Sequence, residues 1–219
     1  MDSHTAAVLV EPLQGEGGVI VPDDDYLPGL RKLCDESGAL LIFDEVQTGV
    51  GRTGKLWGYQ HSGVEPDVMT LAKALANGIP IGAMLCREHV ASVLTAGSHG
   101  STFAGSAFVT SVALAMLTTV IGDKLPDRAA QRGRELMDGL RELGKKLPII
   151  KDVRGKGLLI GIELGKPAGP VMDACREAGL LTLTAGEKVL RLAPPLVVEP
   201  AECRRALEII GDVLGREAK

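Results

Sequence analysis

The stretch "ALLIFDEVQTGVGRTGKL", residues 39–56, joins a short apolar run to an acidic pair and then to a glycine-rich segment. The apolar run at residues 39–43 is continuous and follows Gly38, which is typical of a strand buried on both faces of a parallel sheet. Asp44 then stands at the carboxyl end of that strand, and ligands bind at this end of open α/β sheets. The stretch therefore predicts an α/β fold with a candidate site at Asp44.

The glycines of the same stretch resemble two nucleotide-binding patterns. Those between residues 49 and 54 fit G-x-G-x-x-G, and residues 49–55 fit a P-loop in all but its last position. The first pattern needs a helix at its last glycine, but "KLWGYQHSGVEPDV" follows, which has no helical period. The second needs Ser or Thr where this chain has Leu56, and the acidic pair before the glycines would repel a phosphate. We therefore predict a flexible loop here and no nucleotide site.

Two neighbouring segments repeat the strand-then-polar arrangement. "TAAVLVEPLQGEGG", residues 5–18, is predicted to be a buried strand that ends in Glu11, followed by a glycine-rich loop that carries Glu16. "PDVMTLAKAL" is predicted to be a third strand ending near Lys73. Three strand ends then place Glu11, Asp44 and Lys73 at one edge, which indicates a shared ligand. Two simpler interpretations stay open, in which Asp44 only caps its loop and Lys73 is a solvated surface lysine.

The segment between the first two strands, residues 23–38, is predicted to be a crossover helix. It has an acidic first turn and a closing glycine. Four residues are expected to share one apolar face: Leu27, Leu30, Leu33 and Cys34.

Composition excludes several classes of protein. The 219 residues are 45% hydrophobic with a net charge of -4, and no Lys/Arg cluster with interleaved aromatic residues is present, which argues against a nucleic-acid partner. No apolar run approaches a membrane span and the first residues lack the order of a signal peptide, so we expect a cytoplasmic protein without a membrane partner. The four cysteines and four histidines show no ligand spacing, so we expect neither a metal site nor a disulfide.

The second half of the sequence predicts a separate small domain. Residues 107–122 form an apolar helix suited to linking two domains, so we place the boundary between residues 121 and 122. Residues 127–147 follow as an amphipathic helix whose leucines at helical spacing are explained by core packing. Strands are expected within residues 155–164 and 180–192, and a terminal helix begins at Pro200.

Seven stretches distributed along the whole chain together resemble one family. They are "VEPLQGEGG", "LLIFDEVQTGVGRTG", "PDVMTLAKAL", "PIGAML", "HGSTFAG", "VRGKGLLIGIEL" and "VLRLAPPL". Their order is similar to that of the class III (ornithine-type) aminotransferases that use pyridoxal 5'-phosphate (PLP), most of all the acetylornithine group. The resemblance implies fold type I, with residues 1–121 as the C-terminal part of the large PLP-binding domain and residues 122–219 as the small α/β domain. It also implies a homodimer and a small-molecule amino acid and 2-oxo acid as substrates.

The resemblance implies roles for the residues around the cofactor. Lys73 resembles the lysine that holds PLP as a Schiff base and moves the proton during transamination. Asp44 resembles the partner of the pyridine nitrogen, Val46 the residue packed on the ring, and Gln47 the residue that reaches the phenolic oxygen.

Further residues are implied to bind the phosphate and the substrate. Ser101 and Thr102 resemble the hydroxyl pair that binds the phosphate of the neighbouring subunit's cofactor. Arg191 resembles the arginine that binds the substrate α-carboxylate. Glu16 resembles the glutamate that pairs with this arginine and releases it, and Glu11 resembles a residue supporting the oxygen side of the cofactor.

The chain departs from the family in two ways. It reads "HGSTFAGSAF" where the family usually reads "HGSTFGGNP", so the entry to the following helix is expected to shift slightly. The resemblance also covers only about the C-terminal half of a family member, so the phosphate cup and the aromatic residue that stacks on the ring have no counterpart. We expect weak or absent transamination by the chain alone, with the N-terminal half as a candidate separate partner chain. Two alternatives remain: an inactive dimerisation module, and an enzyme for another ω-amino substrate such as γ-aminobutyrate.

Overall fold

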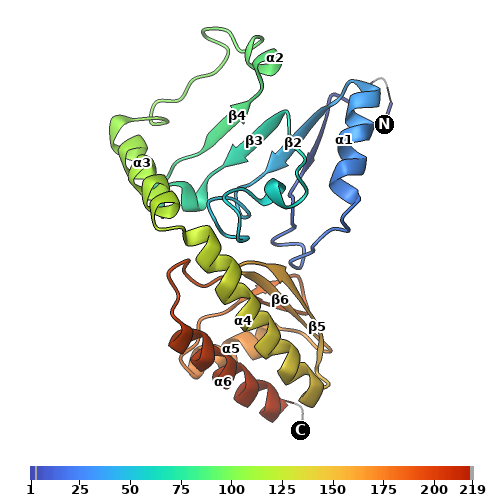
Figure 1. Cartoon of the computed structure of the whole chain (residues 1–219), viewed down its shortest axis with the longest axis vertical. Coiled ribbons are helices and arrows are strands. Elements are labelled where there is room, and N and C mark those ends of the chain that lie inside the picture. The colour runs from blue at the N-terminus through green and yellow to red at the C-terminus, as the bar shows by residue number, and fades with distance from the viewer. Residues whose placement is uncertain (3, 218–219) are drawn as a thin grey trace.

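The computed structural model describes residues 1–2 and 4–217, and its two β-sheets lie at opposite ends of an elongated molecule (Figure 1). The first sheet has the order β1-β2-β3-β4 and the second has the order β5-β6-β8-β7. The sheets fall on either side of the predicted boundary between residues 121 and 122, and the boundary itself stays a prediction.

The first sheet is mixed and mostly parallel. β1, β2 and β3 pair in parallel, and β4 pairs antiparallel with β3. Its strands are β1 (Ala7–Val10), β2 (Leu40–Asp44), β3 (Val68–Leu71) and β4 (Ala83–Cys86). Leu41 and Phe43 are fully buried on one face of β2, whereas Leu40 and Ile42 on the other face are half-buried, so the predicted burial on both faces holds for one face only. The α/β fold predicted from that run is confirmed by the parallel pairing of β1, β2 and β3.

Helices connect and cover the first sheet. They are α1 (Tyr26–Ser37), the short α2 (Glu88–Ala91), α3 (Ala107–Gly122) and the 3-10 helices η1 (Gly58–His61) and η2 (Lys73–Ala76). α1 ends at Gly38 in the left-handed conformation, as expected of a crossover helix closed by glycine. Leu27 and Cys34 face the core, but the prediction that Leu33 shares this face is wrong, because Leu33 is 51% exposed. Each residue turns a helix by about 100°, so Leu33 points away from Cys34. The acidic residues likewise precede the helix instead of forming its first turn.

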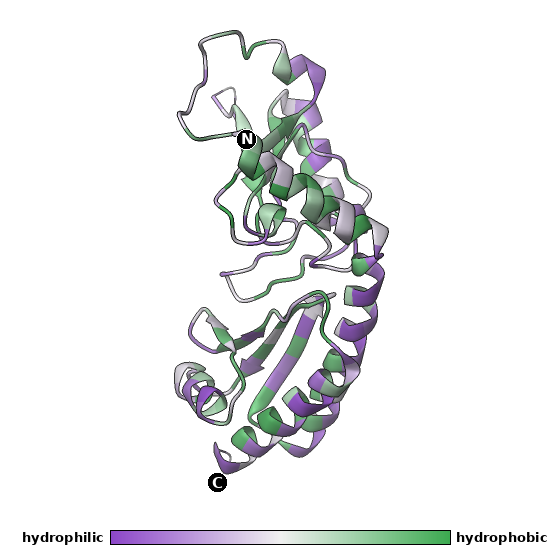
Figure 2. Cartoon of the chain, turned by 90° about the vertical axis from the view of Figure 1, so that its left-hand side faces the viewer, coloured by the Kyte–Doolittle hydropathy of each residue, from purple (hydrophilic) through white to green (hydrophobic). Residues whose placement is uncertain are grey.

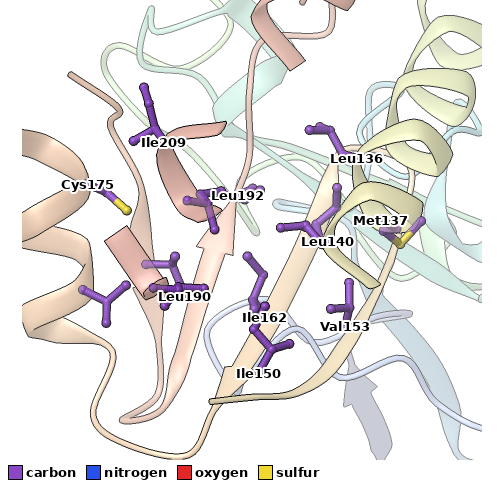
Figure 3. Packing of buried hydrophobic residues seen from close by; sticks show 14 of the residues in the cluster. Leu136, Met137, Leu140, Ile150, Val153, Ile162, Cys175, Leu190, Leu192 and Ile209 are labelled. Atoms are coloured by element: carbon purple, nitrogen blue, oxygen red, sulfur yellow. The ribbon is translucent and has the colours of Figure 1, made fainter. Parts of the chain in front are cut away.

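The second sheet is antiparallel throughout. Its strands are β5 (Ile150–Lys156), β6 (Leu159–Leu164), β7 (Leu183–Ala185) and β8 (Val189–Leu192). Helices α4 (Leu125–Lys146), α5 (Gly169–Glu177) and α6 (Pro200–Glu217) complete this part of the chain. Leu136, Met137 and Leu140 of α4 pack against strand residues such as Ile162 and Leu190 (Figure 3). Among the described residues no single helix has the length and apolar character of a membrane span; α3 and α4 meet that test only as a pair bent by 63°.

The glycine-rich segment at residues 49–54 is packed between the two parts of the chain. Arg52 donates from its Nη1 atom to the carbonyls of Leu158 (3.2 Å) and Pro194 (2.5 Å), and its own carbonyl accepts from Leu158 N–H (2.9 Å). Most of these residues are buried, so the prediction of a flexible loop is wrong. The glycines allow the close approach of backbone to backbone at this junction.

Asp67 joins α1 to the sheet. Its buried carboxylate accepts hydrogen bonds from the Leu41 N–H and from Arg31, each at 2.8 Å. Burial by itself raises the pKa of Asp67, but the Leu41 N–H and the Arg31 guanidinium outweigh burial and hold the pKa below its ordinary value.

We predict that Asp67→Asn lowers the free energy of unfolding by about 1–3 kcal/mol at neutral pH, because Arg31 loses its ion pair. The folded-state pKa is depressed, so the stabilisation is present above the unfolded value of about 4 and is lost as pH falls through the lower folded pKa. Urea unfolding between pH 7 and pH 2 should show the difference between parent and variant shrinking with acid. Asp35→Asn, which removes an exposed partner of Arg31, is the control and should change little. A difference that is the same at every pH would contradict the prediction.

Candidate active site

The three parallel strands bring their carboxyl ends to one edge. Glu11 follows β1, Asp44 ends β2, and Lys73 lies two residues beyond β3. Because β2 pairs with both β1 and β3, the neighbouring strand ends predicted from the sequence are confirmed.

Asp44 has one carboxylate oxygen committed to its own surroundings. Its Oδ1 atom accepts from the Val46 N–H (2.9 Å) and from the Thr70 hydroxyl (3.4 Å). From the residues that the structure describes, Oδ2 receives no hydrogen bond, so it can accept one from a ligand. The capping interpretation and the ligand interpretation of Asp44 therefore apply to different oxygens.

Lys73 is the first residue of η2 and has a positive φ of 40°. A non-glycine residue rarely adopts this conformation, which is enriched at functional sites. Across residues 1–2 and 4–217, its amine has neither an ion pair nor a hydrogen-bond partner. Lys73 is also exposed, so its amine is available for a ligand, and the interpretation as a solvated surface lysine stays open.

A cavity of about 810 Å³ brings together residues from both parts of the chain. Its lining includes Glu16, Val46, Gln47, Lys73 and Arg191. Glu11 and Asp44 line a second hollow of about 780 Å³ instead. The predicted residues therefore fall into two hollows along the strand ends.

Arg191, on β8, is the cationic centre of the first cavity. It is only 7% exposed, and its Nη1 atom donates to Glu16 (2.7 Å) and to the Gln47 side-chain oxygen (3.4 Å). Gln47 in turn donates to Glu16 (3.2 Å). The Arg191 hydrogen bond is the main cause of a lowered pKa for Glu16. The Nε atom of Arg191 is buried without a partner among the described residues, which leaves a donor for a ligand carboxylate.

The structure also assigns roles that the sequence did not indicate. Glu45 is 1% exposed, and its carboxylate accepts from the Thr48 hydroxyl (2.5 Å) and from the N–H groups of Gly58 and Tyr59 (2.8 Å each). Burial raises the pKa of Glu45 above its ordinary value, although these hydrogen bonds by themselves lower it. Glu45 therefore holds the segment after β2 in place, and the only signal for it was its position beside Asp44.

Three residues that were predicted to contact the cofactor or its surroundings lie outside the first cavity. Ser101 and Thr102 lie in an exposed stretch between α2 and α3 and line neither hollow. Glu11 accepts a short hydrogen bond from the Gly15 N–H, so its visible contact is with the loop that carries Glu16. The cofactor roles of all three residues stay predictions.

Comparison with known proteins identifies the family to which the chain belongs. Residues 1–214 match the family described as Aminotransferase class-III. The chain belongs to the class III aminotransferases. Class III aminotransferases are PLP-dependent enzymes, and the α/β fold described above is their fold type I architecture.

Relatives and solved structures of class III aminotransferases agree with this assignment. The chain is 48% identical to the acetylornithine aminotransferase of Synechocystis sp. over 95% of its own length and 50% of that protein. It resembles the ornithine aminotransferase of Toxoplasma gondii, in whose crystals PLP partially occupies the active site, with a TM-score of 0.94, 40% identity and coverage of 99% and 53% of the two chains. The acetylornithine aminotransferase of Elizabethkingia anophelis gives a TM-score of 0.90 at 38% identity, with coverage of 96% and 56%. The chain thus spans about half the length of the proteins that it matches.

Proposed function

We propose that this chain serves a PLP-dependent transamination of N-acetylornithine, or a similar ω-amino substrate, with 2-oxoglutarate. The observation that carries the proposal is the cavity in which the free amine of Lys73 and the Arg191–Glu16 pair lie together. An amine that can bond a carbonyl and an arginine that can bind a carboxylate are the two groups that an amino-acid transaminase requires. The 48% identity to an acetylornithine aminotransferase supports the choice of donor.

The described residues fit PLP. Lys73 offers an unpaired amine, Asp44 offers an unpaired carboxylate oxygen, and Val46 and Gln47 lie just past Asp44 at the same edge. Bound PLP would supply an electron sink for the carbanion at the substrate Cα. Lys73 Nζ would take the proton from that carbon and deliver it to C4′ of the cofactor. Asp44 would keep the ring nitrogen protonated by placing a negative charge beside it.

Arg191 and Glu16 would select substrates by charge. Arg191 is held in place by burial, whereas the Glu16 side chain is 66% exposed and is free to move away. With Glu16 in place the charge of Arg191 is neutralised, and with Glu16 displaced the guanidinium can bind a second carboxylate such as that of 2-oxoglutarate. One cavity would thereby accept a basic amino acid and a dicarboxylic 2-oxo acid in turn.

The test is an assay of amino donors in the presence of the other half of a relative. The chain would be co-expressed with the N-terminal half of the Synechocystis acetylornithine aminotransferase, supplied with PLP, and assayed for glutamate formation from 2-oxoglutarate. We expect the highest kcat/KM with N-acetylornithine and no turnover after Lys73→Ala. A higher kcat/KM with γ-aminobutyrate than with N-acetylornithine would show that the proposed donor is wrong. Stable assembly with PLP bound but no turnover of any donor would favour the inactive module.

We propose a homodimer as the assembled form. Apolar residues predominate along α3 (Figure 2), and Phe108 and Leu114 of this helix are 67% and 68% exposed. Ser101 and Thr102 lie in the exposed stretch just before α3 and line neither hollow of their own chain, which suits contacts to a second copy. A covered α3 face would remove these side chains from water.

We predict that the parent sediments as a dimer at micromolar concentration and that Phe108→Asp shifts it to monomer, because a charge would be buried in the interface. Leu33→Asp, at an exposed leucine of α1, is the matched control and should leave the dimer intact. Sedimentation equilibrium checks both variants. A monomeric parent, or equal disruption by Leu33→Asp, would contradict the prediction.

A further inference from the structure

The segment that carries Glu16 is a small closed loop. Gln14 and Ile20 exchange both backbone hydrogen bonds (3.0 and 3.1 Å), and the Val19 N–H donates to the Gly15 carbonyl (3.1 Å). Glu16 lies at the exposed turn of this loop. In Figure 1 the loop extends from the first sheet toward β5 and β6. The place of Glu16 therefore depends on how the loop is anchored.

One end of the loop has a strained backbone. Val19 has a φ of 50°, which is a rare conformation for a β-branched residue, and its side chain is fully buried. Val19 packs against Leu159 and Val189 of the second sheet. Such a conformation persists only where surrounding contacts enforce it.

Arg154 of β5 provides polar contacts that enforce this conformation. Its Nε atom donates to the carbonyls of Gly18 (3.2 Å) and Val19 (3.1 Å), and its Nη2 atom donates to Gly18 (2.8 Å). The Nη1 atom binds Glu163 (2.6 Å) and Asp152 (2.9 Å). Because two carboxylates neutralise Arg154, its charge competes little with Arg191 for Glu16.

We propose that Arg154 is a positioning residue, which fixes the Gly18–Val19 end of the loop so that the Glu16 carboxylate stays within reach of Arg191. The inference rests on the proposed function in so far as the Glu16–Arg191 pair selects substrates. A planar guanidinium holds five donors in a fixed fork, so Arg154 can serve two carbonyls and two carboxylates at once, whereas an ammonium has only three donors on a flexible stem. Glu11 holds the opposite end through the Gly15 N–H, so the turn between the two anchors carries the movement of Glu16.

The direct test reads the position of Glu16 without any activity. The chain is labelled with ¹³C at glutamate carboxyl groups, the Glu16 signal is assigned by its loss in Glu16→Gln, and its titration is followed by NMR. We expect Glu16 of the parent to titrate below the exposed glutamates, because Arg191 lies beside it. In Arg154→Gln its pKa should rise toward the ordinary value.

Two variants keep this test decisive. Asp152→Asn removes an exposed partner of Arg154 and leaves its carbonyl contacts, so the Glu16 titration should not change. If Arg154→Gln does not fold, Arg154→Lys keeps the charge with a single ammonium and should give a smaller rise. A folded Arg154 variant with an unchanged Glu16 titration would overturn the proposal, as would a parent in which Glu16 titrates like an exposed glutamate.

A second readout separates positioning from general stability. In the co-expressed assembly, Arg154→Gln should shift the ratio of kcat/KM for 2-oxoglutarate to that for N-acetylornithine in the same direction as Glu16→Gln. A uniform loss for both substrates would show a merely structural role. If no transamination occurs at all, the proposed function fails, and the Glu16 titration still decides the role of Arg154.

Discussion

Replacing Gly133 with alanine is expected to lower the free energy of unfolding by about 3 kcal/mol or more, because the new methyl group would overlap the backbone. A Cβ atom at Gly133 would lie 1.9 Å from the Gly157 carbonyl oxygen and 2.4 Å from its carbonyl carbon. The glycine-rich loop packs against the other side of Gly157, because a Cβ placed on Gly157 would lie 2.4 Å from the carbonyl carbon of Thr53, so Gly157 has little room to move away from α4. α4, the β5–β6 turn and the glycine-rich loop therefore touch through backbone atoms.

Urea unfolding of Gly133→Ala against the parent measures this effect. Gly215→Ala in α6 is the matched control, because no atom lies within 4 Å of its added Cβ. The control should be neutral or more stable by up to about 1 kcal/mol, as expected for Gly to Ala in a helix. Equal stability of Gly133→Ala and the parent would show that the junction is looser than described.

Replacing Arg191 with lysine is expected to lower kcat/KM for 2-oxoglutarate about 100-fold in the co-expressed assembly. Loss of the planar fork removes about 3 kcal/mol of charge-assisted hydrogen bonding to a carboxylate. The positive charge is kept, so the effect measures geometry more than charge. Steady-state kinetics with varied 2-oxoglutarate gives the ratio.

Arg205→Lys, at an exposed position of α6, is the control and should leave kcat/KM unchanged. A thermal melt of Arg191→Lys should match the parent closely enough to exclude unfolding as the cause. An Arg191→Lys variant with unchanged kcat/KM would contradict the role assigned to this arginine.

The local sequence pattern was sufficient to predict the three strands whose ends position Glu11, Asp44 and Lys73. The apolar run before Asp44 and the repeated strand-then-polar order predicted three neighbouring parallel strand ends, and the structure has them. Arg191 could be connected to Glu16 only through the family resemblance, because 175 residues separate them. The second sheet brings them together, and no local period reports that contact.

The wrong or missing predictions also concern residues whose roles depend on contacts with distant parts of the chain. Glycines at residues 49–54 indicate flexibility in an isolated segment, but here they permit close backbone packing against α4 and the β5–β6 turn. Glu45 acts through a contact with Gly58, 13 residues away, and Arg154 acts through a contact with Gly18, 136 residues away. Such roles depend on tertiary structure, so composition and spacing do not contain them.

The most direct test of the central claim is to find which lysine bonds PLP. The purified chain, alone and co-expressed with the N-terminal half of the Synechocystis relative, would be incubated with PLP, reduced with borohydride and mapped by mass spectrometry. The proposed site predicts a shifted visible absorption band and a label on Lys73 in the co-expressed assembly, lost in Lys73→Ala. Absorbance of free PLP only, or a label scattered over exposed lysines in that assembly, would contradict it.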